Sequence, residues 1–400
     1  MNDLSSSVRR VLVTVTGRDT PGITAALTGV IADNHATLLD IEQVVVQRQL
    51  TLCMLVDVDP TRAKGEPVLK DLLFTAKRMG LELNFQVLEP VEEEVVPRPR
   101  YAVTAIGDGL TADGVRVLAD VLARNEANIE SIRRLSTGRL LSLEILLSLP
   151  TEGASALRRH LIEAVGDRDI DVAVQRERLT RRAKRLVVMD MDSTLIQIEV
   201  IDELARMHGV VDRVSEITRR AMAGELKYED SLRERVSLLE GMPYEQVLQL
   251  AKKLPVQHGA RDMLTVLRAL GYKTAVISGG FTFAANALKE ELGLDYAYAN
   301  DLEVKDGKLT GRVLDPVVTP QRKADLLDAI AQREGIPLEQ TIAIGDGAND
   351  LTMLERAGLG IAFHAKAKLR AAADTSVSAG GLDRILYLLG LHGRDVEELL

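Results

Sequence analysis

The sequence predicts three domains: two small α+β domains of ferredoxin-like topology, then an α/β domain with a Rossmann-type parallel sheet and a small helical cap. In the first half of the chain, a pattern of strand, glycine turn and amphipathic helix recurs after about ninety residues. The second half alternates apolar strands with helices, and polar motifs stand where the strands end. A helical insert separates the first two motifs. The expected boundaries are 8–90, 99–176 and 183–395, with the cap at about 198–256.

Composition and charge exclude several classes of protein. The chain has 400 residues, 46% of them hydrophobic and 27% charged, as in globular proteins with more than one core. No apolar run reaches about 18 residues, so we expect no membrane span. The start, MNDLSSSVRR, lacks the apolar core of a secretory signal. Cys53 is the single cysteine, which excludes an internal disulfide and a cysteine-based zinc site and indicates a cytoplasmic protein.

The formal net charge of −9 argues against general nucleic-acid binding, because a phosphate backbone needs a basic surface. A small anionic substrate remains possible, provided that local cations or a metal ion accompany it. The six histidines are scattered along the chain, so a histidine-based metal site is not expected.

The two N-terminal domains repeat one pattern. Strands are expected at 10–16 and 101–106, and each leads through a glycine-rich turn into an amphipathic helix. The helices end near Asn34 and Asn125, and further strands follow. Each copy is therefore predicted to form a βαββαβ domain, with an antiparallel sheet and helices on one face.

The first turn, Gly17-x-Asp19-x-Pro21-Gly22, resembles that of the ACT domain family, whose members commonly bind amino acids and regulate metabolic enzymes. Free backbone N–H groups before a helix suit a carboxylate, and Asp19 suits an ammonium group. Alternatively, Pro21-Gly22 is only a tight turn and Asp19 a surface residue.

The second copy departs from this pattern. It lacks the Pro-Gly pair, and Gly109 stands near the position of Asp19. This departure argues against ligand binding by the second copy, although Gly107 and Gly109 are expected to keep the backbone accessible.

Two shifts in composition separate the domains. The segment 89–99 contains three prolines and an acidic run, as expected for an extended linker. The segment 175–185 is strongly basic, and we interpret it as a solvated helix end or linker rather than a binding patch.

Polar motifs follow the predicted parallel strands of the third domain. The strands are expected at 186–189, 274–277, 341–344 and 359–363. The first three end in Asp190-Met-Asp192-Ser-Thr, Ser278-Gly279-Gly280 and Gly-Asp346-Gly-Ala-Asn349-Asp350. Open α/β sheets bind ligands at this edge, although a single such motif could be only a helix N-cap.

Four carboxylates would converge at that edge: Asp190, Asp192, Asp346 and Asp350. Like charges this close cannot all ionise unless a cation offsets them. Oxygen ligands select a hard ion, and Mg²⁺ is the most plausible.

Together with Lys323, these motifs resemble the haloacid dehalogenase superfamily of phosphatases over residues 183–395. The resemblance implies that Asp190 and Asp346 donate carboxylate ligands to Mg²⁺ and that Asp192 donates its backbone carbonyl. It implies that Asn349 and Asp350 order the surroundings of the ion.

The same resemblance implies the roles of the reacting groups. Asp190 attacks phosphorus and forms an aspartyl-phosphate, and Asp192 protonates the leaving oxygen and later activates water. Ser278, Gly279 and Gly280 hold phosphoryl oxygens at a helix start. Lys323 neutralises developing charge, the alternative being a solvated helix lysine.

Stretches of the insert at 199–203, 222–226 and 231–239 resemble phosphoserine phosphatases. A zwitterionic substrate needs an anion for its ammonium group and a cation for its carboxylate, and Glu199 and Arg235 fit these roles. Arg233 and Arg235 cannot both face one site, because they are two apart on a helix. Met222 and Tyr228 either line the pocket or belong to the cap core.

The resemblance implies a Mg²⁺-dependent enzyme that hydrolyses O-phospho-L-serine to L-serine and phosphate, the last step of serine biosynthesis. L-serine is the expected effector of the ACT-like domains, and a homodimer is expected because such domains often pair. Alternatives are a phosphatase for another small metabolite, a phosphotransferase, or an amino-acid-binding regulator with an inactive catalytic domain. The complete set of reacting residues argues against the last.

Overall fold

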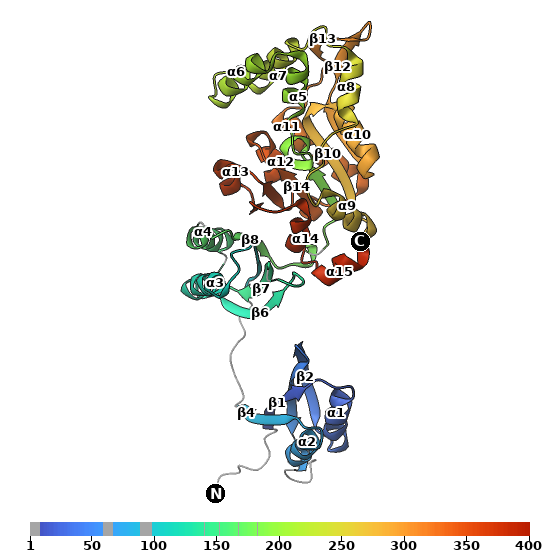
Figure 1. Ribbon diagram of the computed structural model, residues 1–400. Helices are drawn as coiled ribbons and strands as arrows, with labels where there is room; N and C mark the ends of the chain where they lie inside the picture. Colours follow the sequence, from blue (N-terminus) through green and yellow to red (C-terminus); the bar gives the residue numbers. More distant parts are fainter. Residues whose placement is uncertain are drawn as a thin grey trace. The chain divides into compact units, whose positions relative to one another are not determined.

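The computed structural model divides into two compact units, Met1–Val96 and Pro97–Leu400 (Figure 1). It describes residues 9–58, 67–88, 98–139, 141–151, 153–166, 168–181 and 183–400. Residues 89–97 of the expected linker lie outside this range. Within the described residues, no helix combines the length and the apolar character that crossing a membrane requires.

The first unit is a four-stranded antiparallel sheet in the order β2-β3-β1-β4, with two helices packed on one face (Figure 1). Its elements are β1 (Arg9–Arg18), α1 (Ile23–Asp33), β2 (Thr37–Val46), β3 (Gln49–Val58), α2 (Pro67–Arg78) and β4 (Glu82–Leu88). Val13 of β1 and Leu27 of α1 are fully buried in its core. The predicted βαββαβ fold is confirmed, and α1 ends at Asn34 as expected.

The second unit begins with the same topology, in the strand order β6-β7-β5-β8. Its first elements are β5 (Arg100–Ile106), α3 (Ala112–Arg124), β6 (Asn128–Arg134), β7 (Ser142–Ser148), α4 (Ala154–Val165) and β8 (Asp171–Arg176). This second module shares a hydrophobic core with the domain that follows it, since Ile106 and Ala173 are buried in the same cluster as Val187.

The interpretation of the basic segment 175–185 as solvated holds for Arg176, Arg178 and Arg185, which are exposed, but it is wrong for two other cations. Arg181 and Lys184 are each only 5% exposed. The Arg181 guanidinium pairs with Glu144 of β7 at 2.9 Å and with Glu177 at 2.6 Å. Lys184 Nζ donates to the backbone oxygen of Glu339 at 2.6 Å. These cations have partners from other elements, which a charge pattern does not reveal.

The α/β domain contains the predicted parallel sheet, which has six strands in the order β11-β10-β9-β14-β15-β16. The strands are β9 (Leu186–Met189), β10 (Lys273–Phe281), β11 (Tyr296–Asn300), β14 (Thr341–Gly345), β15 (Gly360–Phe363) and β16 (Thr375–Val377). Val187 and Met189 lie in one core cluster and Leu186 and Val188 in another. Both faces of β9 are therefore buried, which explains its unbroken apolar run.

Helices α9 to α15 belong to this domain. They are α9 (Ala260–Ala269), α10 (Thr282–Leu292), α11 (Pro320–Glu334), α12 (Leu351–Arg356), α13 (Ala367–Ala372), α14 (Ile385–Leu388) and α15 (Gly393–Leu399).

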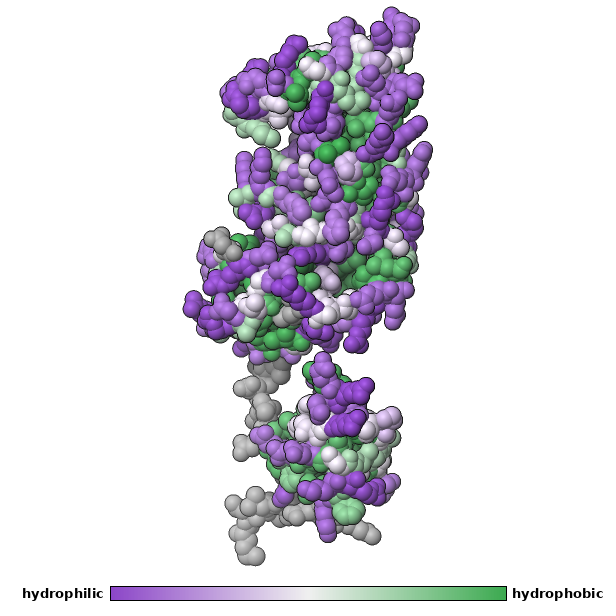
Figure 2. Space-filling model, viewed as in Figure 1, coloured by the Kyte–Doolittle hydropathy of each residue, from purple (hydrophilic) through white to green (hydrophobic). Residues whose placement is uncertain are grey.

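The insert after β9 forms the cap (Figure 1). Its helices are α5 (Val200–His208), α6 (Val211–Met222), α7 (Tyr228–Ser237) and α8 (Tyr244–Ala251). A hairpin of β12 (Leu302–Lys305) and β13 (Lys308–Val313) supports it, with backbone hydrogen bonds of 2.9 Å joining Leu309 to Gly241 and Met242. Hydrophilic side chains cover most of the visible surface around α6 and α7 (Figure 2).

Candidate active site

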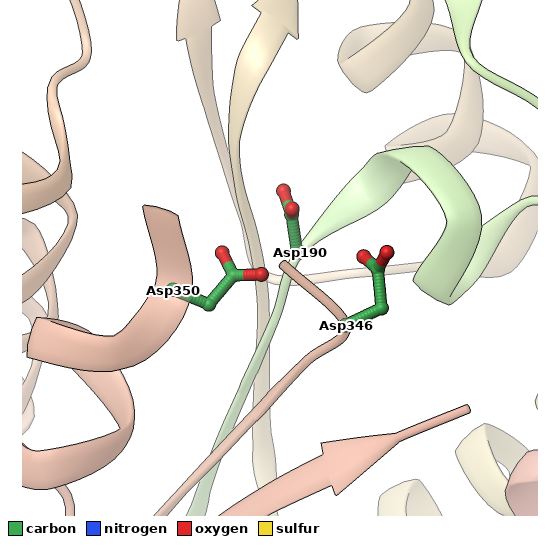
Figure 3. A group of neighbouring side chains, drawn as sticks. All are labelled: Asp190, Asp346 and Asp350. Carbon is green, nitrogen blue, oxygen red and sulfur yellow. The ribbon is translucent and has the colours of Figure 1, made fainter. Parts of the chain in front are cut away.

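The candidate site is centred on Asp190, the first residue after β9. Its backbone N–H donates to the Ile344 oxygen of β14 at 2.9 Å, which fixes it at the carboxyl edge of the sheet. Asp346 and Asp350 follow β14. The three side chains lie close together (Figure 3), and one carboxylate oxygen from each lies within 4.8 Å of the others. The predicted convergence therefore holds for three of the four aspartates.

Lys323 of α11 lies against this cluster and is completely buried. Its Nζ is 2.8 Å from Asp190 Oδ1 and 2.7 Å from Asp350 Oδ1. Burial alone would lower the pKa of Lys323, but the two carboxylates outweigh it and raise that pKa, so the ammonium group stays charged. Lys323 is thus a buried charge partner rather than a solvated helix lysine.

The cluster carries more negative charge than one lysine can balance. Burial and the Asp190 charge raise the pKa of Asp346 to about 7 and the pKa of Asp350 to about 7. Asp350 is held in place by the Gly347 N–H at 3.0 Å, and Asp346 accepts from Thr194 Oγ1 at 3.1 Å. A set of buried carboxylate oxygens with excess charge fits a hard divalent cation such as Mg²⁺.

The Asp192 side chain points away from this trio. Its Oδ1 accepts from the Val200 N–H at 3.0 Å, and its Oδ2 is 3.5 Å from Ser278 Oγ. Burial, followed by the charges of Glu199 and Asp190, raises the pKa of Asp192 well above its ordinary value. A carboxyl group kept protonated in this way can donate a proton to a leaving group.

The segment Ser278-Gly279-Gly280 interrupts the pairing of β10 with β11, whose register shifts between Ile277 and Phe281. The Gly280 N–H donates to Ser278 Oγ at 2.8 Å. Helix α10 begins only at Thr282, so the glycines precede the helix start that we expected them to form.

Close approach explains both glycines of this segment. A Cβ on Gly279 would lie 1.9 Å from the Tyr228 hydroxyl oxygen, and one on Gly280 would lie 2.5 Å from Asp192 Oδ2. Any side chain at either position would therefore push away a site residue. Tyr228 thus reaches the edge of the sheet from the cap.

The cap contributes one anion and one cation. Glu199 precedes α5 and accepts from Ser193 Oγ at 2.8 Å. Burial raises the pKa of Glu199, and the nearby Arg235 charge opposes that rise. The two arginines of α7 diverge, as expected. Arg233 pairs with Asp315 at 2.6 Å, whereas Arg235 Nε donates to the Ser231 oxygen of its own helix, at 3.3 Å, and to no other group in the described part of the chain.

Two of the residues that we expected to line the substrate pocket have fewer contacts with the rest of the site. Met222 ends α6 and is 71% exposed, so it does not belong to the cap core. Asn349 is half-buried in the turn after β14, and its Oδ1 would lie 2.3 Å from a Cβ on Gly347.

Two other residues of this region were not predicted from the sequence. Burial raises the pKa of Asp202 in α5, and the charge of Arg235 opposes the rise more than any other charge does. Asn300, 1% exposed, hydrogen-bonds the Ser278–Gly280 segment. The only signal for Asn300 was a polar residue at the end of an apolar strand.

The glycine turns of the two N-terminal modules differ. In the first, Gly22 caps α1 at a φ of 94°, a Cβ there would meet nothing, and the Asp19 side chain is exposed. In the second, a Cβ on Gly107 would lie 2.0 Å from the Asp169 oxygen, and one on Gly109 would lie 1.7 Å from the oxygen of residue 168. Packing therefore requires the glycines of the second turn.

The backbone of that second turn is also occupied, against our expectation of an accessible backbone. The Gly107 N–H donates to the Leu141 oxygen at 3.0 Å, and the Gly109 N–H donates to the Asp169 oxygen at 3.2 Å.

Three family profiles match the chain. The haloacid dehalogenase-like hydrolase family matches residues 187–355, and two ACT domain families match residues 9–86 and 100–175. A phosphoserine phosphatase of Streptomyces coelicolor is 42% identical over 98% of this chain and 95% of its own length. Phosphoserine phosphatase SerB2 of Mycobacterium tuberculosis is 40% identical over 97% of this chain and 94% of its own length.

Two solved structures are similar to the chain. A HAD family hydrolase from Salmonella enterica superposes with a TM-score of 0.64 and 30% identity, covering 72% of this chain and 98% of its own. The unliganded structure of a probable phosphoserine phosphatase from Vibrio cholerae gives a TM-score of 0.57 and 37% identity, covering 76% of this chain and 90% of its own.

Proposed function

The chain belongs to the phosphoserine phosphatase family, a group of haloacid dehalogenase-like phosphatases, and we propose that it hydrolyses O-phospho-L-serine to L-serine and phosphate. The observation that carries the proposal is the convergence of Asp190, Lys323, Asp346 and Asp350 at one sheet edge, with cap residues of opposite charge facing it.

The cap residues suit a small zwitterion. Arg235 makes no ion pair within 4 Å among the described residues, so its guanidinium is available for a substrate carboxylate. Glu199 would accept from the ammonium group. The Tyr228 hydroxyl lies beside Gly279, and the charges of Lys323 and Arg235 both act on it, which supports a place for Tyr228 between the phosphoryl and carboxylate ends of the substrate. Burial raises the pKa of Tyr228 to about 12, so this hydroxyl stays a hydrogen-bond donor.

The first half of the reaction transfers the phosphoryl group to Asp190. A carboxylate oxygen of Asp190 forms a bond to phosphorus as the bond between phosphorus and the serine oxygen breaks. Asp192 gives its proton to that oxygen, and L-serine leaves. Lys323 holds the attacking carboxylate in one orientation, since its Nζ is 2.8 Å from Asp190 Oδ1.

The second half restores the enzyme. Asp192, now ionised, takes a proton from a water molecule whose oxygen attacks phosphorus. The bond between phosphorus and Asp190 breaks, and phosphate leaves. Ser278 would donate its hydroxyl hydrogen to a phosphoryl oxygen, because Ser278 Oγ already accepts from the Gly280 N–H. The carboxylates of Asp190 and Asp346 and the backbone carbonyl of Asp192 would hold Mg²⁺, which when bound supplies positive charge against the phosphoryl oxygens.

The test is phosphate release from a panel of phosphate esters with Mg²⁺, using the parent and Asp190→Asn. We expect O-phospho-L-serine to be the best substrate and the variant to lose at least about 10³-fold in kcat. A preference for another ester would show that the substrate assignment is wrong. An Asp190→Asn variant with nearly the parental activity would overturn the mechanism. Transfer of phosphate to an added alcohol in place of water would instead identify a phosphotransferase.

We infer further that the reaction ends L-serine biosynthesis and that L-serine inhibits it by binding the first ACT domain. Support for this comes from the open turn around Gly22 and the exposed Asp19, whereas the second turn is closed by its own packing. Inhibition by L-serine should weaken in Asp19→Ala without a change in kcat. Unchanged inhibition would exclude this turn as the sensor. A homodimer formed through the ACT domains is part of this proposal, and sedimentation with and without L-serine tests it.

A further inference from the structure

Asn300, the last residue of β11, links the Ser278–Gly280 segment to the segment that leads into α11. Its Nδ2 donates to the Gly279 oxygen at 2.7 Å and to the Gly280 oxygen at 3.1 Å. Its Oδ1 accepts from the Val318 N–H at 2.7 Å. The side chain is 1% exposed, so both amide hydrogens and the carbonyl oxygen are committed inside the protein.

These contacts set the direction of the backbone in the Ser278–Gly280 segment. In a trans peptide the C=O and the following N–H point in opposite directions. When Asn300 holds the Gly279 oxygen, the N–H of Gly280 is therefore turned to the other side, where it donates to Ser278 Oγ at 2.8 Å. The Ser278 hydroxyl hydrogen is then left to donate on the side of Asp192, whose Oδ2 lies 3.5 Å from Ser278 Oγ. Asn300 thus orients the donor that the proposed mechanism assigns to a phosphoryl oxygen.

The other end of the amide reaches the segment that carries Lys323. Val318 is followed by Thr319, whose Oγ1 accepts from the Arg322 N–H at 3.2 Å and caps α11. The Lys323 N–H donates to the Thr319 oxygen at 3.0 Å. One buried side chain therefore fixes the spacing between the hydroxyl of Ser278 and the helix of Lys323.

We propose that Asn300 is a positioning residue for phosphoryl transfer, acting through Ser278, which it anchors to the segment before α11, without touching the substrate. The inference rests on the proposed phosphatase function. Aspartate at this position has nearly the same shape as asparagine but replaces two donors by a carboxylate oxygen, which would face two carbonyl oxygens. The Ser278–Gly280 segment would then turn away, and a misplacement of about 1 Å can cost about 100-fold in rate.

The experiment compares Asn300→Asp and Asn300→Ser with Asn125→Asp, a matched control. The Asn125 amide also donates to a backbone oxygen (Val121, 2.8 Å), but this residue lies in the second N-terminal module, at the C-terminal cap of α3. We expect Asn300→Asp to lower kcat by about 10- to 100-fold and to weaken inhibition by inorganic phosphate by at least about fivefold. The Mg²⁺ concentration for half-activation should stay within about twofold, because the hydrogen bonds of Asn300 go to backbone groups of residues 279, 280 and 318 and, among the described residues, to none of the three carboxylates. Asn300→Ser keeps one donor, so its kcat should fall between that of the parent and that of Asn300→Asp.

A double-mutant cycle with Ser278→Ala separates positioning from general damage. If Asn300 acts through Ser278, the Asn300→Asp change should cost less than about threefold in kcat once Ser278 has been replaced. Measurements are made at least 10 °C below each variant's melting temperature, a margin of about that size being enough to keep it folded.

The outcomes distinguish this inference from the function on which it rests. A parent without phosphatase activity, or Ser278→Ala at full rate, defeats the proposed function. If the parent is fully active and Ser278→Ala is impaired, the proposed function stands. The inference alone is then defeated if Asn300→Ser keeps the parental kcat and the parental inhibition by phosphate. The inference also fails if the two losses multiply in the double variant, or if Asn300→Asp does not fold and Asn300→Ser leaves phosphate inhibition unchanged.

Discussion

Replacing Lys323 by methionine should destabilise the metal-free protein strongly, because it leaves two buried carboxylates without their cation. Lys323 Nζ is within 2.8 Å of Asp190 and 2.7 Å of Asp350, and the lysine is completely buried. Removing one partner of a buried ion pair costs about 3–5 kcal/mol. With about 2–4 °C per kcal/mol for a domain of this order of size, the melting temperature of the second unit should fall by roughly 6–20 °C.

The assay is thermal unfolding in EDTA at pH 5 and pH 8. The folded-state pKa of Asp350 is about 7, above its unfolded value, so the folded protein holds an extra proton at low pH and loses that stabilisation as the pH rises through 7. Without Lys323 this pKa rises further. The difference in melting temperature between the parent and Lys323→Met should therefore be larger at pH 8 than at pH 5.

A second substitution provides the control. Lys323→Met combined with Asp350→Asn removes one buried charge and should recover at least half of the lost melting temperature at pH 8 while remaining inactive. A single variant that melts within about 2 °C of the parent at both pH values would refute the reasoning. A double variant no more stable than the single one would do the same.

The charges of the site and of the core lead to three more predictions. Arg235→Ala should lower kcat/KM on O-phospho-L-serine by roughly 10- to 150-fold but by less than about twofold on an ester that lacks the carboxylate, because only the phosphoserine complex loses charged hydrogen bonds. The control Arg233→Ala should affect both esters equally. Equal losses on the two esters for Arg235→Ala would exclude a role for Arg235 in binding the substrate. Mg²⁺ should raise the melting temperature more at pH 8 than at pH 5, because Asp346, with a pKa of about 7, must be ionised to bind it; a larger rise at pH 5 would contradict the site. Burial lowers the folded-state pKa of Lys184 to about 8, so above pH 8 the unfolded chain binds more protons than the folded one. The free energy of unfolding of the parent, relative to that of Lys184→Met, should therefore rise by about 2 kcal/mol between pH 7.5 and 9.5. Urea titrations of both proteins at the two pH values measure this difference.

The strands of the parallel sheet and the sheet edge that carries the reacting residues could be predicted, because short stretches of consecutive residues determine both. A strand such as β9 is apolar throughout because both of its faces are buried, and its end is marked by Asp190. The topology of a parallel sheet then brings Asp190 and Asp346 together without any knowledge of side-chain contacts.

The interactions that could not be predicted join residues far apart in the chain. Arg181 belongs to a basic run typical of a solvated segment, yet its partner Glu144 is 37 residues earlier. Asn300 binds backbone oxygens 20 and 21 residues earlier, and backbone atoms leave no mark in a sequence. The place where α10 begins and the direction of the Asp192 side chain depend on local geometry that spacing alone leaves open.

The two N-terminal modules should respond differently to truncation, because only one shares a core with the phosphatase domain. Residues 1–96 form a compact unit of their own. The second module buries Ile106 and Ala173 in the catalytic core, and Asp171 accepts hydrogen bonds from Ser376 Oγ at 3.0 Å and from the Ser378 N–H at 2.6 Å. A chain that begins at residue 97 should therefore keep parental kcat and lose inhibition by L-serine. One that begins at residue 183 exposes that apolar surface to water and should melt at least about 5 °C lower. Equal melting temperatures for the two shortened chains would show that the shared core contributes no stability, and L-serine inhibition that survives removal of residues 1–96 would assign sensing to another part of the chain.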